Sequence, residues 1–399
     1  MKIGLFTDTY VPEVNGVVTV LKTMARELKR EGHEVHIFCP SHPDRDDSCT
    51  EVYGFPSLKF IFYRGMRVAI PYNPSTLRLI STMDIIHSHD PGTIGLLGLW
   101  ASGRYHIPHI HTYHTLYMDY RRYLPRVIRP TRGIVKSLSR LFCNRCNAII
   151  APSSQMKREL ESYGITQPVH ALPFGVDEEE FSHEIKWNVR TALNIPSKDL
   201  LLYVGRFGKE KNLDFLLRAF QQLLSLRPGA RLIIAGDGPQ REFLEKYALS
   251  LGIAQFVTFI GFLQRRDLVD LYKQASLFVF ASKTETQGLV LVEAMMAGVA
   301  VVAVGMMGPL DIITSGETGI LVGEDENEFA QACNKLLQNN NERQRIGIAA
   351  REWARSQSSQ VSTKRLLDIY SRCTLQKPAE SLTIRYPETR EEKLPPLLR

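Results

Sequence analysis

The chain has 399 residues, of which 44% are hydrophobic and 23% are charged, and these proportions are ordinary for a folded globular protein. Its length is enough for two or three domains of about 100–200 residues each. A net charge of +7 and an isoelectric point of about 9.0 favour an anionic partner, namely nucleic acid, an anionic membrane surface or a phosphorylated substrate. No run approaches about 18 apolar residues, so we expect no membrane-spanning helix.

The cysteines do not form a recognisable framework. They are Cys39, Cys49, Cys143, Cys146, Cys333 and Cys373. Only the pair at 143 and 146 has the spacing of metal ligands, and no second pair completes a set of four. We therefore expect reduced thiols in a cytosolic protein, and we expect no metal.

The first elements predict a parallel sheet. Lys2–Thr7 is a strand that is too short for the core of a signal peptide, 17–31 has the apolar spacing of a helix, and 35–39 is a second strand. This βαβ order implies parallel strands. Between the first strand and the helix lies Asn15-Gly16, which predicts either a backbone contact to a ligand or a plain turn.

Two segments of the first half have a polar and an alternating pattern. Asp44-Arg45-Asp46 has a DxD spacing, but the loop around it is polar and contains proline, which favours a solvated surface over a metal site. Leu58–Arg67 alternates bulky apolar and basic residues, which is typical of a strand. The alternative for this segment is a lipid-facing edge of a binding pocket.

Six histidines fall within 87–114. Met83–His87 is a predicted strand, and a second predicted strand carries His109 and His111 on one face. No acidic or cysteine side chain has a spacing that would complete a metal site with them, so we favour polar chemistry at the end of a strand. A purely structural histidine is the alternative.

A strongly basic segment follows at 121–145, with seven arginines, one lysine and no acidic residue. After two prolines, 131–146 can form a helix. One stripe of this helix is basic and consists of Arg132, Lys136 and Arg140. The other side is apolar and consists of Ile134, Leu138, Leu141 and Phe142. We favour contact with an anionic leaflet, and the alternative is a helix that packs on the sheet with a solvated basic face. The aromatic residues here are not spaced as a stacking platform, so we expect no nucleic acid partner.

A second sheet begins after an acidic linker that ends near Lys186. Leu200–Val204 is its first strand, and the loop 205–212 follows with Arg206 and Lys211. Two cations in a glycine-containing loop at the carboxyl end of a strand suit a diphosphate, whose developing charge they would stabilise as it leaves. Further strands are predicted at 231–235 and 256–262, and Gly236-Asp-Gly238 lacks the third glycine of a dinucleotide fingerprint.

The segment 277–304 carries most of the functional information. Two apolar runs, Leu277–Phe280 and Val299–Val304, enclose a polar loop and a short helix. Loops at the carboxyl ends of parallel strands face the ligand crevice. Gly288 opens the helix, whose first N–H groups suit a phosphate, while Glu285 and Glu293 can accept hydrogen bonds from hydroxyl groups on either side. One phosphate seat between two such carboxylates predicts a nucleotide-sugar site.

The remaining segments are simpler. Gly308–Asp311 and Gly316–Val322 are predicted to be turns and a hairpin-like segment, and two helices follow. Residues after about 376 are polar and contain proline, so we expect them to be disordered.

These motifs resemble one family. The spacing of Glu285 and Glu293 matches the E-x7-E signature of the family 4 retaining glycosyltransferases, which have the GT-B fold. Thr-Glu-Thr-Gln-Gly at 284–288, Glu-Ala-Met at 293–295 and His-Thr-Tyr-His-Thr at 111–115 are similar to words of the bacterial diacylglycerol glycosyltransferases. The loop at 205–212 resembles the diphosphate loop of the family. Many members have two glycines in place of Asn15-Gly16, and the family usually has asparagine where Phe174 stands.

The resemblance covers roughly 1–370 and implies two Rossmann-like, doubly wound α/β domains that face each other across a cleft. The domains expected are 1–172 for the acceptor, 173–355 for the nucleotide sugar, a helix at 356–375 that returns to the first domain, and a disordered tail at 376–399. The resemblance implies a retaining transferase, with attack from the front face, that needs no cofactor and no metal. It would move a hexose, glucose by preference, from a UDP-sugar to diacylglycerol. We expect a cytoplasmic protein on the inner face of the cell membrane.

The resemblance also assigns roles to residues. The catalytic group is expected to be His114, Glu285, Arg206 and Lys211. His114 matches the histidine of a similar word that lies over the donor sugar in the family, and His111 is the second candidate for that position. The donor-binding group is expected to be Gly16, Arg206, Lys211, Gly261, Glu285, Gln287, Gly288, Leu289 and Glu293. Apart from the resemblance, the basic stripe of the helix at 131–146 predicts that Arg132, Lys136 and Arg140 contact the membrane.

Other functions share these residues. A transferase that uses another lipid or a soluble sugar as acceptor has the same donor site, and Glu285 serves glucose or galactose alike. A UDP-sugar-binding protein without turnover would bind the donor and release no UDP. An epimerase of the same fold would need further acid and base residues, which we do not identify in the sequence.

Overall fold

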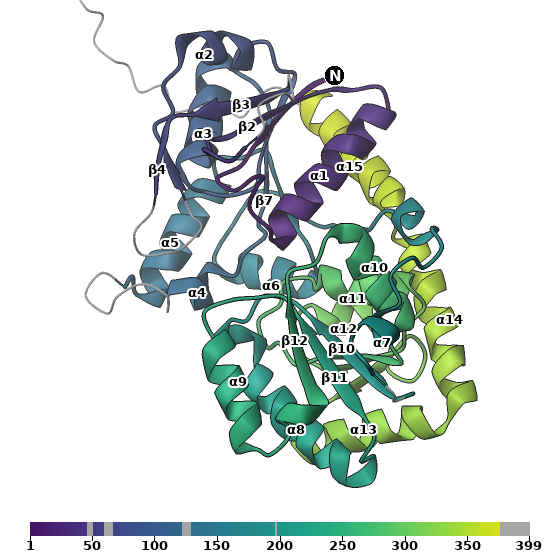
Figure 1. The fold of residues 1–399 in the computed structure, drawn as a ribbon. Helices are drawn as coiled ribbons and strands as arrows, with labels where there is room; N and C mark the ends of the chain where they lie inside the picture. Colours follow the sequence, from purple (N-terminus) through teal and green to yellow (C-terminus); the bar gives the residue numbers. More distant parts are fainter. Residues whose placement is uncertain (46–50, 60–66, 122–128, 196–197, 376–399) are drawn as a thin grey trace, which may run out of the picture.

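The computed structural model describes residues 1–45, 51–59, 67–121, 129–195 and 198–375 (Figure 1). Two parallel sheets, each flanked by helices, follow one another along the chain. The strands of the first sheet lie before residue 172, and those of the second lie after residue 199. The segment expected to be a disordered tail, 376–399, lies outside the described residues.

The first sheet has seven parallel strands in the order β3-β2-β1-β6-β7-β8-β9. Their bounds are Lys2–Phe6 for β1, Glu34–Pro40 for β2, Val52–Phe55 for β3, Ile85–Ser88 for β6, His109–Thr112 for β7, Ala148–Ala151 for β8 and Val169–Ala171 for β9. Both faces of this sheet are covered by helices, so strands such as β1, β6 and β8 are buried along almost their whole length. The predicted βαβ order is confirmed.

Helices α1 (Gly16–Arg30) and α15 (Ser359–Leu375) pack on one face of this sheet, as Figure 1 shows. The opposite face is covered by α3 (Thr93–Tyr105), α5 (Arg132–Cys143) and α6 (Ser154–Ser162). The shorter helices of this half are α2 (Pro74–Ile80) and α4 (Tyr117–Tyr120). Helix α15 follows the second sheet in sequence, and its residues Leu366 and Tyr370 lie in the apolar core of the first. The end of the described chain therefore crosses back to the first sheet.

Two of the segments predicted in the region 44–67 lie partly outside the described residues. The alternating segment becomes β4 (Ser57–Lys59) and β5 (Arg67–Ala69), which pair antiparallel, and 60–66 between them lies outside the described residues. Asp46 of the DxD word and Cys49 also lie outside the described residues.

The second sheet has six parallel strands in the order β12-β11-β10-β13-β14-β15. Their bounds are Leu200–Val204 for β10, Arg231–Ala235 for β11, Val257–Gly261 for β12, Leu277–Phe280 for β13, Val301–Val304 for β14 and Ile320–Val322 for β15. The prediction of a hairpin-like segment at 316–322 is wrong, because β15 pairs parallel with β14 and completes the sheet. A three-residue strand between glycines has the local pattern of a hairpin, and only its distant partner shows its direction.

Eight helices and three 3₁₀ turns of the described chain accompany this sheet. The helices are α7 (Val189–Ala192), α8 (Leu213–Leu226), α9 (Arg241–Ser250), α10 (Arg265–Gln274), α11 (Leu289–Met296), α12 (Pro309–Ile312), α13 (Glu326–Gln338) and α14 (Asn340–Ser356). The 3₁₀ turns are η2 (Glu178–Phe181), η3 (Lys209–Lys211) and η4 (Ala254–Phe256).

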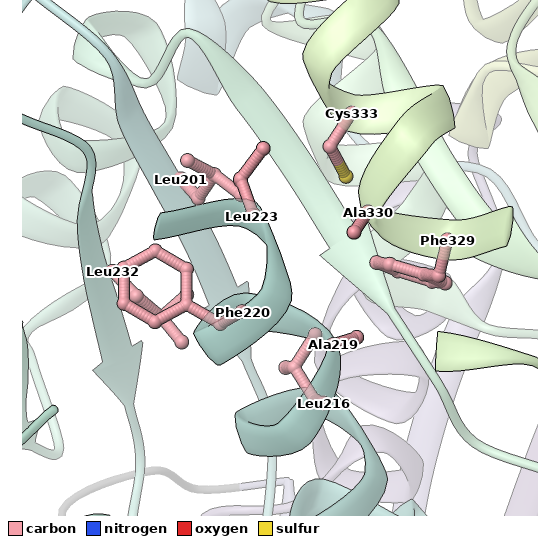
Figure 2. Close-up of a pocket in the computed structure, with 9 residues that line it drawn as sticks. All are labelled: Leu201, Leu216, Ala219, Phe220, Leu223, Leu232, Phe329, Ala330 and Cys333. Carbon is pink, nitrogen blue, oxygen red and sulfur yellow. The ribbon is translucent and has the colours of Figure 1, made fainter. Parts of the chain in front are cut away.

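Helices α8 and α13 pack together beside the sheet, and Figure 2 shows the apolar side chains between them. The small void there is lined by Leu201, Leu216, Ala219, Phe220, Leu223, Leu232, Phe329, Ala330 and Cys333. A lining without oxygen or nitrogen side-chain atoms offers no partner for a phosphate or a sugar hydroxyl. This void is a packing defect of the core, and the candidate site lies elsewhere.

The strand order reverses once in each sheet. In the first sheet the reversal lies between β1 and β6, and in the second it lies between β10 and β13. Ligands of open parallel sheets bind at the carboxyl ends of the strands that flank such a reversal. In the second sheet these two strands are followed by the loops that carry Lys211 and Glu285. Within the described residues, no helix is long and apolar enough to cross a membrane.

Candidate functional site

Two loops of the second sheet meet through an ion pair. Lys211 Nζ lies 2.5 Å from Glu285 Oε2, and the two side chains are only 18% and 19% exposed. Burial lowers the pKa of the Lys211 ammonium, but Glu285 outweighs this effect and the net pKa is raised. Lys211 is therefore a permanent cation at neutral pH. Burial lowers the pKa of Arg206 in the same loop, yet a guanidinium stays charged in proteins.

The start of α11 needs a glycine. Gly288 has φ +90°, in the left-handed region, and a Cβ atom there would lie 2.8 Å from Leu291 Cδ1. The first N–H groups of α11 lack acceptors within the helix, and the helix dipole adds partial positive charge at this end. Leu289, the first residue of α11, packs against the apolar cores of both sheets. The predicted phosphate seat thus lies where the two halves of the chain meet.

Glu293 lies deeper in α11 and is 4% exposed. Its Oε1 accepts a hydrogen bond from Arg265 Nη1 at 2.5 Å, and its Oε2 accepts one from Tyr272 Oη at 2.8 Å. A buried carboxylate needs such partners to stay charged. A carboxylate has about four acceptor positions, and the described contacts use two of them. The predicted role of Glu293 toward ribose hydroxyls stays a prediction, now with Arg265 and Tyr272 beside it.

His114 lies where the two halves of the chain touch. Its Nε2 is 2.9 Å from His89 Nδ1, and its ring stacks on Phe174 with 5.5 Å between ring centroids. Its carbonyl oxygen accepts a hydrogen bond from Thr286 Oγ1 at 2.8 Å, and Thr286 belongs to the loop of Glu285. Burial lowers the pKa of His114 to about 3, so its imidazole is neutral near pH 7.

His111, the second candidate, is placed differently. It is 1% exposed, its Nδ1 lies 2.8 Å from Ser88 Oγ, and its ring contacts Phe142 of α5 with 4.7 Å between centroids. The same Ser88 hydroxyl also lies 2.7 Å from His109 Nε2. These two histidines are part of the core of the first sheet, which leaves His114 as the candidate that lies at the junction.

Gln287 holds the two halves together. Its Nε2 donates to the carbonyl oxygen of Phe174 at 2.6 Å, and its Oε1 accepts from the N–H of Phe174 at 3.0 Å. The side chain is buried, and both ends of its amide are engaged with one backbone unit. The predicted donor contact of Gln287 stays a prediction. The described geometry gives it a structural role in fixing the crossing segment.

Two further glycines were predicted to contact the donor. Gly16 begins α1, and no described atom lies within 4 Å of a Cβ atom built there, so the fold itself does not require a glycine at this position. Asn15 caps the helix through its side chain, which accepts from the N–H of Val18. Gly261 ends β12 with φ +78°, and the exposed ring of Phe262 follows it. Gly16 is exposed and Gly261 is half-buried, and the donor contacts predicted for both stay predictions.

The described residues contain no group of three or more His, Cys, Asp or Glu side chains that could hold a metal ion. Cys143 and Cys146 are buried, and burial raises the pKa of both thiols. The Sγ atom of Cys146 lies 3.6 Å from His109 Nδ1, in the core of the first sheet.

Helix α5 has three faces where the sequence predicted two. It packs inward through Val135, Ser139, Phe142 and Cys143. The expectation that one apolar side would contain Phe142 together with Ile134, Leu138 and Leu141 is wrong. The last three form an outer apolar ridge, and their side chains are 48%, 59% and 54% exposed. The predicted basic stripe lies beside it, with Arg132 and Arg140 exposed and Lys136 5.2 Å from the ring of Tyr163.

Sequence reasoning missed the partners of the predicted site. Arg265 and Tyr272 hold Glu293, and Thr286 and Phe174 join the halves of the chain. The sequence does contain one indication that Glu293 needs a partner such as Arg265. A glutamate in the apolar word around residue 293 is expected to be buried, and a buried carboxylate requires a cation, although the sequence does not say which one.

Comparisons with known proteins show the family to which the chain belongs. Residues 14–180 match the family model described as Glycosyltransferase Family 4, and residues 185–353 match the one described as Glycosyl transferases group 1. The alpha-monoglucosyldiacylglycerol synthase of Streptococcus pneumoniae is 36% identical over 318 residues, which cover 76% of this chain and 71% of that protein. The chain is a family 4 glycosyltransferase of the GT-B fold.

This glycosyltransferase is also similar to an enzyme with another named donor and to a solved structure. The GDP-mannose-dependent alpha-mannosyltransferase of Mycobacterium tuberculosis is 28% identical over 386 residues, covering 93% of this chain and 96% of that one. The structure of HepE from Anabaena in complex with UDP and glucose superposes with a TM-score of 0.77. That match covers 93% of this chain and all of HepE at 18% identity, so it shows a shared fold.

Proposed function

We propose that this glycosyltransferase moves glucose from UDP-glucose to diacylglycerol at a membrane surface, with retention of the anomeric configuration. The observation that supports the donor site best is the meeting of the Lys211–Glu285 ion pair and the start of α11 at the reversal of the second sheet. The relative from Streptococcus pneumoniae, named as an alpha-monoglucosyldiacylglycerol synthase, supports the acceptor.

In this proposal, positive groups of the protein surround the negatively charged diphosphate of the donor. The diphosphate lies at the first N–H groups of α11, with Arg206 and Lys211 as its counter-charges. Glu285 then exchanges its contact with Lys211 for the hydroxyl groups of the donor hexose. Glu293 accepts the hydroxyl groups of the ribose. The sugar and the nucleoside are thus held on opposite sides of the phosphate seat.

The transfer step follows from the same charges. The bond from the anomeric carbon to the β-phosphate oxygen breaks, and UDP leaves with the bonding electron pair. Arg206 and Lys211 are fixed in place before the reaction, so they stabilise the charge that develops on the diphosphate. The acceptor hydroxyl attacks from the face that UDP leaves, and its proton passes to the departing phosphate. His114 is neutral and orients the donor sugar by a hydrogen bond.

The surface of α5 supports a membrane-associated acceptor. The outer apolar ridge of Ile134, Leu138 and Leu141 can enter the boundary of the lipid headgroups, and Arg132 and Arg140 beside it can contact anionic lipids. Leu96 and Trp100 of α3, which covers the same face of the first sheet, are also about half exposed. We propose that this face brings the first sheet to the lipid that carries the acceptor hydroxyl.

The mannosyltransferase relative supports a second candidate function, in which the donor is a different nucleotide sugar. The sequence of a GDP-mannose-dependent enzyme matches 93% of this chain, which supports a donor with another base and hexose as the second possibility. Glu285 accepts hydrogen bonds from glucose, galactose or mannose alike. The choice of donor therefore depends on contacts around the base and the sugar that surround the phosphate seat.

The test is a nucleotide-release assay. The purified protein is incubated with UDP-glucose, UDP-galactose or GDP-mannose, each with diacylglycerol in mixed micelles or with micelles alone. The proposal expects nucleotide release with UDP-glucose that depends on diacylglycerol and increases with anionic lipid. Release that occurs only with GDP-mannose, or that does not depend on diacylglycerol, would contradict it.

A further inference from the structure

The carboxylate of Glu293 is fixed by two donors from α10. Arg265 Nη1 lies 2.5 Å from Oε1, and Tyr272 Oη lies 2.8 Å from Oε2, so each oxygen has its own partner. The two donors come from opposite ends of α10, which packs against α11. Two contacts of this kind leave the carboxylate one orientation and leave about two of its acceptor positions unfilled.

Arg265 is itself fixed by a second carboxylate. Its Nε lies 2.7 Å from Glu180 Oε2 in η2, and its guanidinium lies 5.5 Å from the centroid of the Phe181 ring. Arg265 thus bridges Glu180 and Glu293 with different nitrogen atoms of one rigid plane. Burial lowers the pKa of Arg265, but the two glutamates outweigh it and the net pKa is raised.

A further ion pair links Glu180 to α1, which packs on the first sheet. Arg26 of α1 lies 3.3 Å from Glu180 through Nη1 and 2.8 Å from Asp177 through Nη2. Glu180 therefore stands between Arg26 and Arg265, and the series runs from α1 through η2 and α10 to α11. In Figure 1, α10 and α11 lie directly below α1, in agreement with these contacts.

Burial accounts for one cation beside Glu293, because a carboxylate that is 4% exposed needs such a partner. Burial does not account for the second carboxylate on Arg265, whose own side chain is 34% exposed. Glu293 lies in the second turn of α11, the helix that begins at the phosphate seat. A second carboxylate on Arg265 improves the placement of the first one, because it stops the long arginine side chain from rotating away.

We infer that Arg265 is a positioning residue, which aims the free acceptor positions of Glu293 at the ribose hydroxyl groups of the donor nucleotide. This inference rests on the proposed donor site, and it adds a residue that no motif of the sequence marked. Glu180 has the same function one step further away, because it fixes Arg265.

The test compares two nucleotides that differ only in the hydroxyl groups concerned. Binding of UDP and of 2′,3′-dideoxyuridine 5′-diphosphate is measured by calorimetry for the wild type and the variants E293Q, R265M and E180Q. Arg266, the exposed neighbour on the same helix, supplies the matched control R266M. Thermal unfolding of each variant is followed in parallel.

The wild type should bind UDP more tightly than the dideoxy nucleotide. In R265M the affinity for UDP should fall by about ten- to hundredfold, the range expected for hydrogen bonds to a charged group. Its affinity for the dideoxy nucleotide should stay at the wild-type value. E293Q should show the same ribose-specific loss, E180Q a smaller loss of the same kind, and R266M none.

Other outcomes separate the inference from the proposed function. An equal loss for both nucleotides in R265M would mean that Arg265 acts through the phosphates or the fold, and would overturn the inference alone. A wild type that binds both nucleotides equally would overturn it as well. A wild type that binds no UDP at all would overturn the proposed function. Should R265M fail to fold, E180Q decides the question, because it leaves Arg265 in the chain, and an equal loss for both nucleotides in E180Q would again overturn the inference.

Discussion

Replacement of Lys211 by methionine separates catalysis from structure. The variant K211M keeps a side chain of similar length but removes the ammonium group, which lies 2.5 Å from Glu285 Oε2. We propose that this ammonium stabilises the departing diphosphate. Loss of one such preorganised group lowers kcat by about 10²–10³-fold, which corresponds to about 2.7–4 kcal/mol. The assay is nucleotide release from UDP-glucose with diacylglycerol in mixed micelles.

The same variant also leaves Glu285 without its partner. Both side chains are about one-fifth exposed, so the unpaired carboxylate lowers the free energy of unfolding by about 1–3 kcal/mol. The double variant K211M/E285Q removes this unpaired charge. It should recover most of the lost stability, measured by urea unfolding, and none of the lost activity. Turnover of K211M at the wild-type rate would refute our reasoning, and so would recovery of activity together with stability in the double variant.

Four further outcomes are expected. G16A should leave the free energy of unfolding unchanged or higher, since no described atom lies within 4 Å of the new Cβ, but calorimetry should show weaker donor binding; unchanged donor affinity would remove Gly16 from the site. Q287L should lower the free energy of unfolding by about 1–3 kcal/mol for each backbone group of Phe174 that it leaves without a partner. An unchanged melting temperature would contradict the structural role of the two hydrogen bonds between Gln287 and Phe174. L138E should weaken binding to anionic vesicles in a flotation assay, whereas L249E, at the more exposed Leu249 of the second sheet's α9, should not; equal effects would rule out the ridge of α5. Stability should fall as the pH drops below about 6.5, by about 1.4 kcal/mol per pH unit for each proton that only the unfolded chain binds, because burial lowers the pKa of seven histidines, five of them within 87–114. Burial raises the pKa of Asp8, Glu13 and Asp90, the last to about 8, which gives a weaker opposite slope, and urea unfolding that shows greater stability in acid would contradict this balance.

Most strands of both sheets could be predicted from the sequence because their residues are buried on both faces. Runs such as Leu277–Phe280 and Arg231–Ala235 are short, apolar and bounded by turn residues, so their local pattern fixes their position. The short strand Ile320–Val322 could not be predicted, since its direction depends on pairing with Val301–Val304 and not on its own residues.

The faces of α5 show another limit. Its sequence contains one apolar set with Val135 and Phe142 and another with Leu138 and Leu141, and the helix periodicity alone does not say which set meets the core. The position of the neighbouring strands decides it, and the structure turns the second set outward. That outcome changes the proposed membrane contact from a basic stripe alone to an apolar ridge with basic residues beside it.

Some contacts of the candidate site could also be predicted from the sequence, and others could not. The loops of Lys211 and Glu285 follow strands at a reversal of strand order, so their meeting could be expected from topology. The contact between Arg265 and Glu293 could not, because 28 residues separate them and their meeting depends on how α10 packs on α11. Gln287 is a similar case: its word resembles a donor motif, while its amide binds the backbone of Phe174.

The central claim is that a hexose passes from a UDP-sugar to a lipid hydroxyl group with retained configuration. The most direct measurement is NMR of the lipid product after incubation with diacylglycerol and UDP-glucose that carries ¹³C at the anomeric carbon. Our account predicts that the label appears on the lipid as the α-anomer. A β-linked product, or labelled free glucose with no labelled lipid, would contradict it.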